Sequence, residues 1–138
     1  MTGVSAPMTR DFLSAVAGHE RPKRLFARLE TVHRLPSGFL FHGSRGRGKH
    51  TFATHWAHRT VCTAKTEVAC GRCPSCKLYV SANHPDCRVV APNEESPTTI
   101  SIAEIRDLRE WFSLSPSLAD RRIAIIDQAE KLSGGTDN

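Results

Sequence analysis

The chain has 138 residues, of which 39% are hydrophobic, and it carries 19 Lys and Arg against 14 Asp and Glu. This length suits one globular domain, and apolar runs such as IAII at Ile123–Ile126 are far too short to cross a bilayer, which excludes a membrane-spanning protein. The net charge of +5 suits nucleic acid or an acidic partner without indicating either. Because the N-terminus has no basic region followed by an apolar core, we expect a cytoplasmic protein.

Helical and extended segments alternate along the chain, and this alternation predicts an α/β domain. In chain order we expect a helix at residues 21–35, a strand at 39–41, helices at 51–62 and 76–82, a strand at 87–92, a helix at 101–112 and a strand at 122–127. The segment FLF, residues 39–41, is wholly apolar, as a buried central strand would be. We see no internal repeat and no low-complexity segment.

The helix at residues 101–112 has the clearest start signal. Ser101 and Glu104 have the spacing of a capping box, in which each side chain accepts a hydrogen bond from the other residue's backbone amide. The expected buried face of this helix is an apolar stripe made of Ile102, Ile105, Leu108 and Phe112.

The glycine-rich segment after the first expected strand has the pattern of a phosphate-binding loop. Gly43, Gly48 and Lys49 match G-x-x-x-x-G-K, and they stand between an apolar strand and a helix, as that motif requires. Such glycines let backbone amides point inward at an anion, and the lysine reaches the outer phosphates. The pattern predicts a nucleotide site, and the alternative is a glycine-rich turn without a ligand.

Two positions depart from an ATP-hydrolysing site. The residue after Lys49 should offer a hydroxyl to Mg²⁺, but it is His50, and Thr51 is rotated by about 100° around the helix. Because Mg²⁺ prefers oxygen, we expect His50 to pack or face solvent. Asp127, at the end of the last strand, could help to hold a hydrated Mg²⁺, but Gln128 stands where a glutamate would orient water. The sequence therefore indicates nucleotide binding without efficient hydrolysis.

Four cysteines follow the spacing of a metal site. Cys62, Cys70, Cys73 and Cys76 read C-x7-C-x2-C-x2-C, and four thiolates at such spacing can close a tetrahedron around a structural zinc ion. Two alternatives stay open: Cys87 could replace Cys62 as the fourth ligand, or the cysteines could be unrelated free thiols.

Six stretches together resemble the N-terminal AAA+ domain of bacterial clamp-loader subunits, and of these the delta prime subunits of DNA polymerase III most of all. They lie between Val16 and Leu132 and comprise GHERPKRLFARLE, GFLFHGSRGRGKHTFA, the cysteine cluster, NHPDCRVVAP, SIAEIRDLREWFSLSP and RRIAIIDQAEKL. The resemblance implies a P-loop AAA+ core, with a parallel sheet flanked by helices and an inserted zinc module. It places Ala17 and Gly18 beside the adenine, and the phosphate loop at Gly43, Gly46, Gly48 and Lys49.

The resemblance also implies a role in DNA replication. Clamp loaders of this family are pentamers that use ATP binding to open a ring-shaped sliding clamp and place it on primed DNA. The implied partners are the gamma or tau subunits and the delta subunit, and through the assembled complex the sliding clamp and primed DNA. The resemblance also implies that a delta prime subunit binds ATP or ADP without hydrolysing it. One alternative is an active gamma/tau-type ATPase. Another is a zinc-dependent nucleic-acid-binding module with a vestigial loop, whose phosphate contacts would be Arg45, Arg47, Arg72 and Lys77.

We assign residues 1–132 to the first part of such a domain, with the zinc module at about residues 62–76, and residues 133–138 to a polar tail that we interpret as the end of a truncated chain. Members of the resembling family continue into further strands, an arginine-finger motif, a lid and a collar domain. Their fourth strand lies between the first and third, so we do not expect three strands to form one continuous sheet here. Exposed strand edges would then make the isolated chain marginally stable or prone to oligomerise.

Overall fold

The computed structural model of the protein describes residues 16–64 and 69–132, so the predicted polar tail lies outside the described residues. Its elements are α2 (Glu20–Thr31), α3 (Lys49–Val61), α4 (Pro74–Val80), β1 (Cys87–Val90), α5 (Ile102–Ser113), β2 (Ile123–Ile126) and a short 3-10 helix at Ala129–Lys131. All four helices and two of the three strands occur where the sequence predicts them. Within these residues, none of the helices is both long and apolar enough to cross a membrane.

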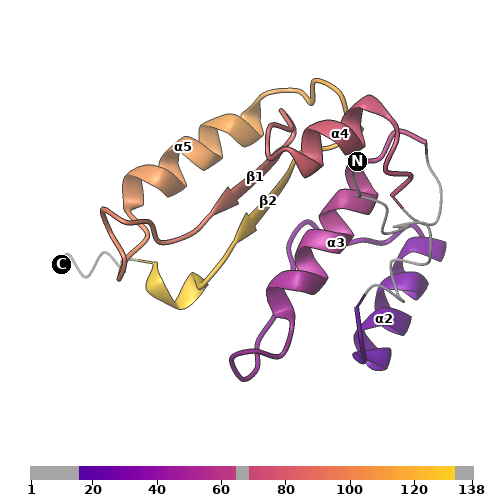
Figure 1. Ribbon diagram of the computed structural model, residues 1–138, viewed down its shortest axis with the longest axis horizontal. Coiled ribbons are helices and arrows are strands. Elements are labelled where there is room, and N and C mark those ends of the chain that lie inside the picture. The colour runs from indigo at the N-terminus through magenta and orange to yellow at the C-terminus, as the bar shows by residue number, and fades with distance from the viewer. Residues whose placement is uncertain (1–15, 65–68, 133–138) are drawn as a thin grey trace, which may run out of the picture.

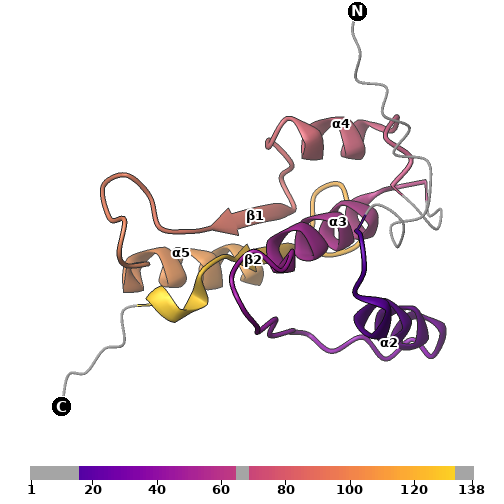
Figure 2. The same ribbon diagram turned by 60° about the horizontal axis from the view of Figure 1, so that its bottom comes forward.

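The two strands form a parallel pair in which Cys87 lies opposite Ile123 and Val90 lies opposite Ile126. Parallel neighbours need a long crossover connection, and α5 provides it. The strands run between α5 and α3, and in both views α3 lies between α2 and the strands (Figure 1, Figure 2). This arrangement brings the first turn of α3 close to the C-terminal end of β2.

The prediction of a buried central strand at residues 39–41 is wrong. The sheet described here has two strands, and residues 39–41 belong to neither of them. Leu40 is 80% exposed, and a cavity of about 390 Å³ lies between this segment and β2. A short apolar segment becomes a strand only where a neighbour pairs with its backbone groups, and no described strand lies close enough to do so. As expected, the three extended segments do not join into one sheet.

Aromatic packing holds residues 39–41 in place instead. The ring of Phe26 on α2 lies 4.6 Å from that of Phe39 and 5.9 Å from that of Phe41, measured between ring centroids. The same ring also meets two rings of α3 edge to face, Phe52 at 5.1 Å and Trp56 at 4.6 Å. Such pairs contribute about 0.5–1.5 kcal/mol each beyond the area they bury. The segment that leads into the glycine-rich loop is therefore tied to both α2 and α3.

The start of α5 confirms the predicted capping box. The hydroxyl of Ser101 accepts a hydrogen bond from the amide of Glu104 at 3.2 Å, and the Glu104 carboxylate accepts one from the amide of Ser101 at 2.8 Å. These contacts satisfy backbone donors that have no partner inside the helix.

The predicted apolar stripe of α5 is only partly correct. Leu108 is buried, but Ile102 is 52% exposed and Phe112 is 48% exposed. Trp111 is buried in place of Phe112, and its indole N–H donates to the carbonyl of Pro85 at 3.3 Å. A sheet of two four-residue strands covers only a narrow strip of the helix. The helix therefore buries Trp111, whose ring is larger than that of Phe112 and whose N–H group has a hydrogen-bond acceptor there.

A fully buried carboxylate fastens the loop that leads into β2. Asp86 accepts hydrogen bonds from the amides of Ser117, Leu118 and Ala119 at 2.7, 2.7 and 2.8 Å, and Arg122 lies 3.6 Å away. Burial acts to raise the pKa of Asp86, but the three amide donors outweigh it and hold the pKa below its ordinary value.

Candidate nucleotide and metal sites

The glycine-rich loop has the backbone form of an anion-binding turn. Its φ angles are +141° at Gly43, +74° at Gly46 and +79° at Gly48, in a region that side chains strongly disfavour. α3 begins at the next residue, Lys49, whose ammonium group donates to the carbonyls of Gly43 at 2.7 Å and Ser44 at 3.0 Å. The lysine is thus held over the loop, at the positive end of a helix.

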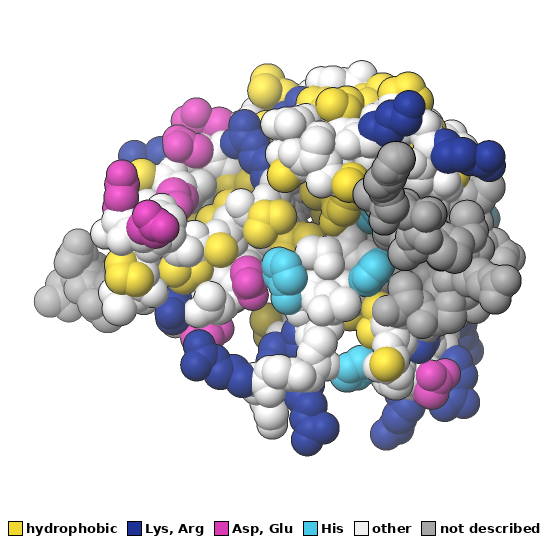
Figure 3. Space-filling model, in the orientation of Figure 1, with side chains coloured by type: hydrophobic (Ala, Val, Ile, Leu, Met, Phe, Trp, Pro, Cys, Tyr) yellow, Lys and Arg dark blue, Asp and Glu magenta, His cyan; other side chains and the backbone are white. Residues whose placement is uncertain are grey.

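Open space lies on both sides of this loop. A cavity of about 850 Å³ separates it from the end of β2 and is lined by Lys49, His50 and Gln128 among others. A second cavity, of about 640 Å³, lies between the loop and the start of α2 and is lined by Lys49, His19 and Arg21 among others. On the face shown in Figure 3, Lys and Arg side chains gather along the lower edge, where the loop before α3 lies, whereas most of the visible Asp and Glu side chains lie on the α5 side of the molecule. The charge distribution therefore favours an anion at the loop.

His50 is exposed, which is one of the two outcomes expected for it, and it has a neighbour that the sequence did not indicate: its Nδ1 atom lies 3.3 Å from Oδ2 of Asp127. The His50 side chain is 49% exposed and that of Asp127 is 37% exposed, so both are accessible to solvent, and His50 also lines the 850 Å³ cavity. Gln128 follows with a positive φ of +54° and lines the 850 Å³ cavity, as does Thr51. The structure thus brings together the residues that the sequence singled out on α3 and after β2.

The segment before α2 also lies beside the loop. Ala17 and Gly18 are exposed, and the neighbouring His19 places its Nε2 atom 3.5 Å from where a Cβ on Gly48 would stand. His19 lines the 640 Å³ cavity together with Arg47. The structure thus places His19 beside the loop, and the assignment of Ala17 and Gly18 to the adenine end of a nucleotide stays a prediction.

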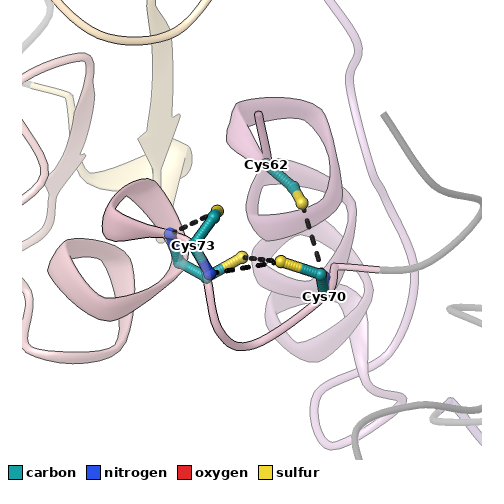
Figure 4. A group of neighbouring side chains, drawn as sticks. Cys62, Cys70 and Cys73 are labelled. Atoms are coloured by element: carbon teal, nitrogen blue, oxygen red, sulfur yellow. Dashed lines mark hydrogen bonds between the residues drawn. The ribbon is translucent and has the colours of Figure 1, made fainter. Parts of the chain in front are cut away.

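The four predicted cysteines converge at the other end of α3. The sulfur atoms of Cys62, Cys70, Cys73 and Cys76 all lie within 4.8 Å of one another (Figure 4). Backbone amides donate to three of them, from Cys70 to Cys62 at 3.4 Å, from Cys73 to Cys70 at 3.3 Å and from Cys76 to Cys73 at 3.3 Å. Cys87 lies in β1 and is not part of this group, so the geometry favours Cys62 over Cys87 as the fourth member.

The electrostatics of this cluster suit a soft cation. Hydrogen bonds from the backbone of Arg72 and Cys73 lower the pKa of Cys70. Burial acts to raise the pKa of Cys73, but hydrogen bonds from Thr63 and from the amide of Cys76 bring it down to about 5. Burial raises the pKa of Cys76, whose proton a bound cation would displace. Four sulfur atoms at this spacing fit a zinc ion and leave no open coordination position.

Sequence reasoning missed a buried polar chain that links the cysteine cluster to β1. The hydroxyl of Ser75, fully buried beside Cys76, donates to the carbonyl of Val61 at 2.5 Å and lies 2.7 Å from Nε2 of His84. Nδ1 of His84 accepts a hydrogen bond from the amide of Asp86 at 3.0 Å. The sequence did carry a signal for it in His84-Pro85-Asp86, immediately before β1. Proline favours a turn, and the side chains of His84 and Asp86 can both form hydrogen bonds with backbone groups.

These features define a small α/β domain with a parallel sheet, a phosphate-loop turn at the start of a helix and a four-cysteine cluster consistent with a zinc site. A family model described as "DNA polymerase III, delta subunit" matches residues 18–138. The chain belongs to this family.

Its curated relatives include three subunits named delta prime and several named gamma or tau. The DNA polymerase III subunit delta prime of Pseudomonas aeruginosa is 33% identical over 95 residues, which are 68% of this chain and 29% of the relative. That of Bacillus subtilis is 32% identical over 105 residues, 76% of this chain and 31% of the relative. Subunit gamma/tau of Mycoplasma pneumoniae is 29% identical over 119 residues, 86% of this chain and 17% of the relative. The chain thus spans about a third or less of the length of these relatives.

Proposed function

We propose that this protein acts in DNA replication as a delta prime-type subunit of the DNA polymerase III clamp loader, built on an AAA+ core. In this role it binds ATP or ADP without efficient hydrolysis and helps to place the sliding clamp on primed DNA, in a complex with gamma or tau and delta subunits. The proposal rests on two observations: the chain belongs to this family, and the residue after the lysine of its phosphate loop is His50, which faces Asp127.

The site supports binding more than turnover. Lys49 and the loop amides can hold phosphates. The hydroxyl that would hold Mg²⁺ is replaced by His50, so the residues present do not fit that ion well. Gln128 can form hydrogen bonds with water but is a poor proton acceptor.

The cysteine cluster supports a structural role for zinc. We assign Cys62, Cys70, Cys73 and Cys76 as ligands, because their sulfur atoms share one centre. A closed four-sulfur site leaves no position for a substrate, so its contribution is to stability.

An active gamma/tau-type ATPase is the second candidate. It is favoured by relatives of that name, which match over more of the chain, for example 124 residues at 27% identity in subunit tau of Bacillus subtilis. The two candidates differ in whether the purified protein turns over ATP.

A dedicated nucleic-acid-binding surface has less support. Arg45 and Arg47 precede the N-terminal end of α3. Arg72 and Lys77 instead lie near the cysteine cluster, beyond the C-terminal end of α3. A helix of 13 residues is about 20 Å long, so these four cations do not form one compact patch.

The first test compares ATP binding and ATP turnover in the wild type, Lys49→Ala and Lys77→Ala. Loss of a charged hydrogen-bonding partner should weaken ATP binding by about tenfold or more in Lys49→Ala, whereas the exposed Lys77 on α4 serves as a control with unchanged affinity. We expect binding by calorimetry with no steady release of phosphate. Steady turnover that Lys49→Ala abolishes would contradict the proposal and favour the gamma/tau candidate.

The second test is whether the protein assembles into a clamp-loader complex. The protein, mixed with the gamma or tau and delta subunits of its own source, should elute with them as one complex and support clamp loading on primed DNA. Failure to enter the complex, with all proteins folded, would contradict the assignment as a clamp-loader subunit.

A further inference from the structure

We propose that His50 and Asp127 together hold the divalent ion that accompanies the nucleotide, and that the imidazole ligand makes this site prefer a first-row transition-metal ion over Mg²⁺. The inference rests on the proposed nucleotide binding and adds the identity of the ion. It follows from a mismatch in ligand chemistry, because His50 offers a nitrogen atom where Mg²⁺ prefers an oxygen atom.

The spacing of the two side chains suits one shared ion. Metal–nitrogen and metal–oxygen bonds of about 2.0–2.2 Å place two neighbouring ligands of the same ion about 3.0–3.4 Å apart. Nδ1 of His50 and Oδ2 of Asp127 are separated by 3.3 Å. An ion between them would need little movement of either side chain.

The two side chains come from elements that hold them facing each other. His50 lies in the first turn of α3, Asp127 directly follows β2, and α3 packs against β2. The backbone amide of Asp127 donates to the carbonyl of Val90 at 2.8 Å, which continues the strand pairing up to this residue. The carboxylate is therefore carried on fixed backbone.

The surroundings supply the rest of a nucleotide-dependent ion site. His50 lines the 850 Å³ cavity next to Lys49, and Asp127 lies between Ile126 and Gln128, which also line it, so phosphate oxygens held by the loop would lie on the His50 side of the pair. Phosphate oxygens and water can complete the coordination, which explains why two protein ligands suffice. A site of one imidazole nitrogen and several oxygens binds first-row transition metals more tightly than it binds Mg²⁺, because nitrogen is a poor ligand for Mg²⁺.

Mn²⁺ is the appropriate probe. It is the weakest binder of the first-row series at nitrogen and oxygen sites, so preference for Mn²⁺ over Mg²⁺ is the most demanding form of the test. It also competes poorly for the four thiolates, which keeps the cysteine cluster out of the measurement.

The experiment measures ATP affinity of the purified protein by calorimetry with Mn²⁺, with Mg²⁺ and with neither ion. Because coupled ligands change each other's affinity by about 5–150-fold, we expect ATP to bind at least about fivefold more tightly with Mn²⁺ than with Mg²⁺. His50→Ser, which restores a hydroxyl, should reduce this ratio to about one. His55→Ser, on the same helix but away from the residues that line the cavity, should leave the ratio unchanged.

A spectroscopic reading decides the ligand directly. Electron spin echo modulation of Mn²⁺ bound with ATP should show a coordinated ¹⁴N nucleus in the wild type and in His55→Ser, and none in His50→Ser. The wild-type spectrum is informative even if the variant fails to fold, which its zinc content and circular dichroism would reveal. Equal ATP affinity with both ions and no ¹⁴N signal would overturn this inference alone. Absence of ATP binding under every condition would overturn the proposed nucleotide binding itself.

Discussion

At the scale of single residues, His84 shows how hydrogen-bond partners select one protonation state. The Ser75 hydroxyl gives its one proton to the carbonyl of Val61, so Nε2 of His84 must carry the proton that joins it to Ser75. Nδ1 of His84 then accepts from the amide of Asp86, which only the neutral ring can do. Burial lowers the pKa of His84 and outweighs the attraction of the Asp86 carboxylate, which acts in the opposite direction.

A pH dependence of stability follows. Because the pKa of His84 is lower in the folded protein than its ordinary value of 6.5, the unfolded chain binds this proton more readily. The stability due to neutral His84 is complete above about pH 6.5 and is lost as the pH falls below that value. We expect His84→Asn to cost about 1–3 kcal/mol near pH 8 and to be less sensitive to acid.

The measurement is the difference in unfolding free energy between the wild type and His84→Asn, from urea titrations at several pH values. Effects of the cysteine cluster and of other histidines are common to both proteins and cancel. The difference should shrink on going from pH 8 to pH 5. A difference that stays constant with pH would show that His84 is not held neutral.

At the scale of elements, α3 joins the two candidate sites. The phosphate loop leads into its first residue, Lys49, and Cys62 directly follows its last residue, Val61. The cysteine cluster therefore anchors the C-terminal end of the helix whose N-terminal end follows the candidate phosphate loop. α2 packs on α3 through Phe26, so both ends of α3 are supported by contacts outside the helix.

The metal assignment predicts different outcomes for two cysteine variants. Cys62→Ser removes one of four converging sulfur atoms and should lose most of its bound zinc and unfold at a lower temperature. Cys87→Ser, in β1, should retain about one zinc per chain. Elemental analysis and thermal unfolding of both variants provide the check. Zinc lost from Cys87→Ser and kept by Cys62→Ser would support the rival ligand set.

At the scale of the whole molecule, Asp86 connects segments that are distant in the chain. Its carboxylate accepts from the amides of Ser117, Leu118 and Ala119, and Arg122 lies beside it. Arg122 in turn lies over the ring of Trp111 on α5, at 4.8 Å from the ring centroid. This buried group fixes how the connection from α5 returns to β2, and the end of β2 in turn places Asp127 beside His50 at the candidate nucleotide site.

Asp86→Asn should therefore destabilise the molecule strongly. The change leaves Arg122 without its carboxylate and turns an NH₂ group toward amide donors, so we expect a loss of about 3–5 kcal/mol in unfolding free energy. Asp107→Asn, on an exposed position of α5, should change stability by less than about 0.5 kcal/mol. Chemical unfolding of the two variants measures both values. A cost below that of an ordinary surface change would show that Asp86 is not a structural anchor.

Prediction from sequence succeeded where local interactions decide. The capping box of Ser101 and Glu104 and the glycines of the phosphate loop act over a few residues, so their patterns indicate structure directly. It failed at residues 39–41 and at Phe112, because a strand needs a paired neighbour and a helix buries whichever side its neighbours cover.

By itself, the sequence of this protein determined the order of its helices and two strands, the phosphate-loop turn, the cysteine spacing and the family. Only the tertiary structure decided that His50 faces Asp127, that Cys62 and not Cys87 joins the cysteine cluster, and that Ser75 and His84 form a buried polar chain. The reason is physical: local patterns depend on backbone geometry within a few residues, whereas these contacts depend on how separate elements pack, which no local pattern encodes.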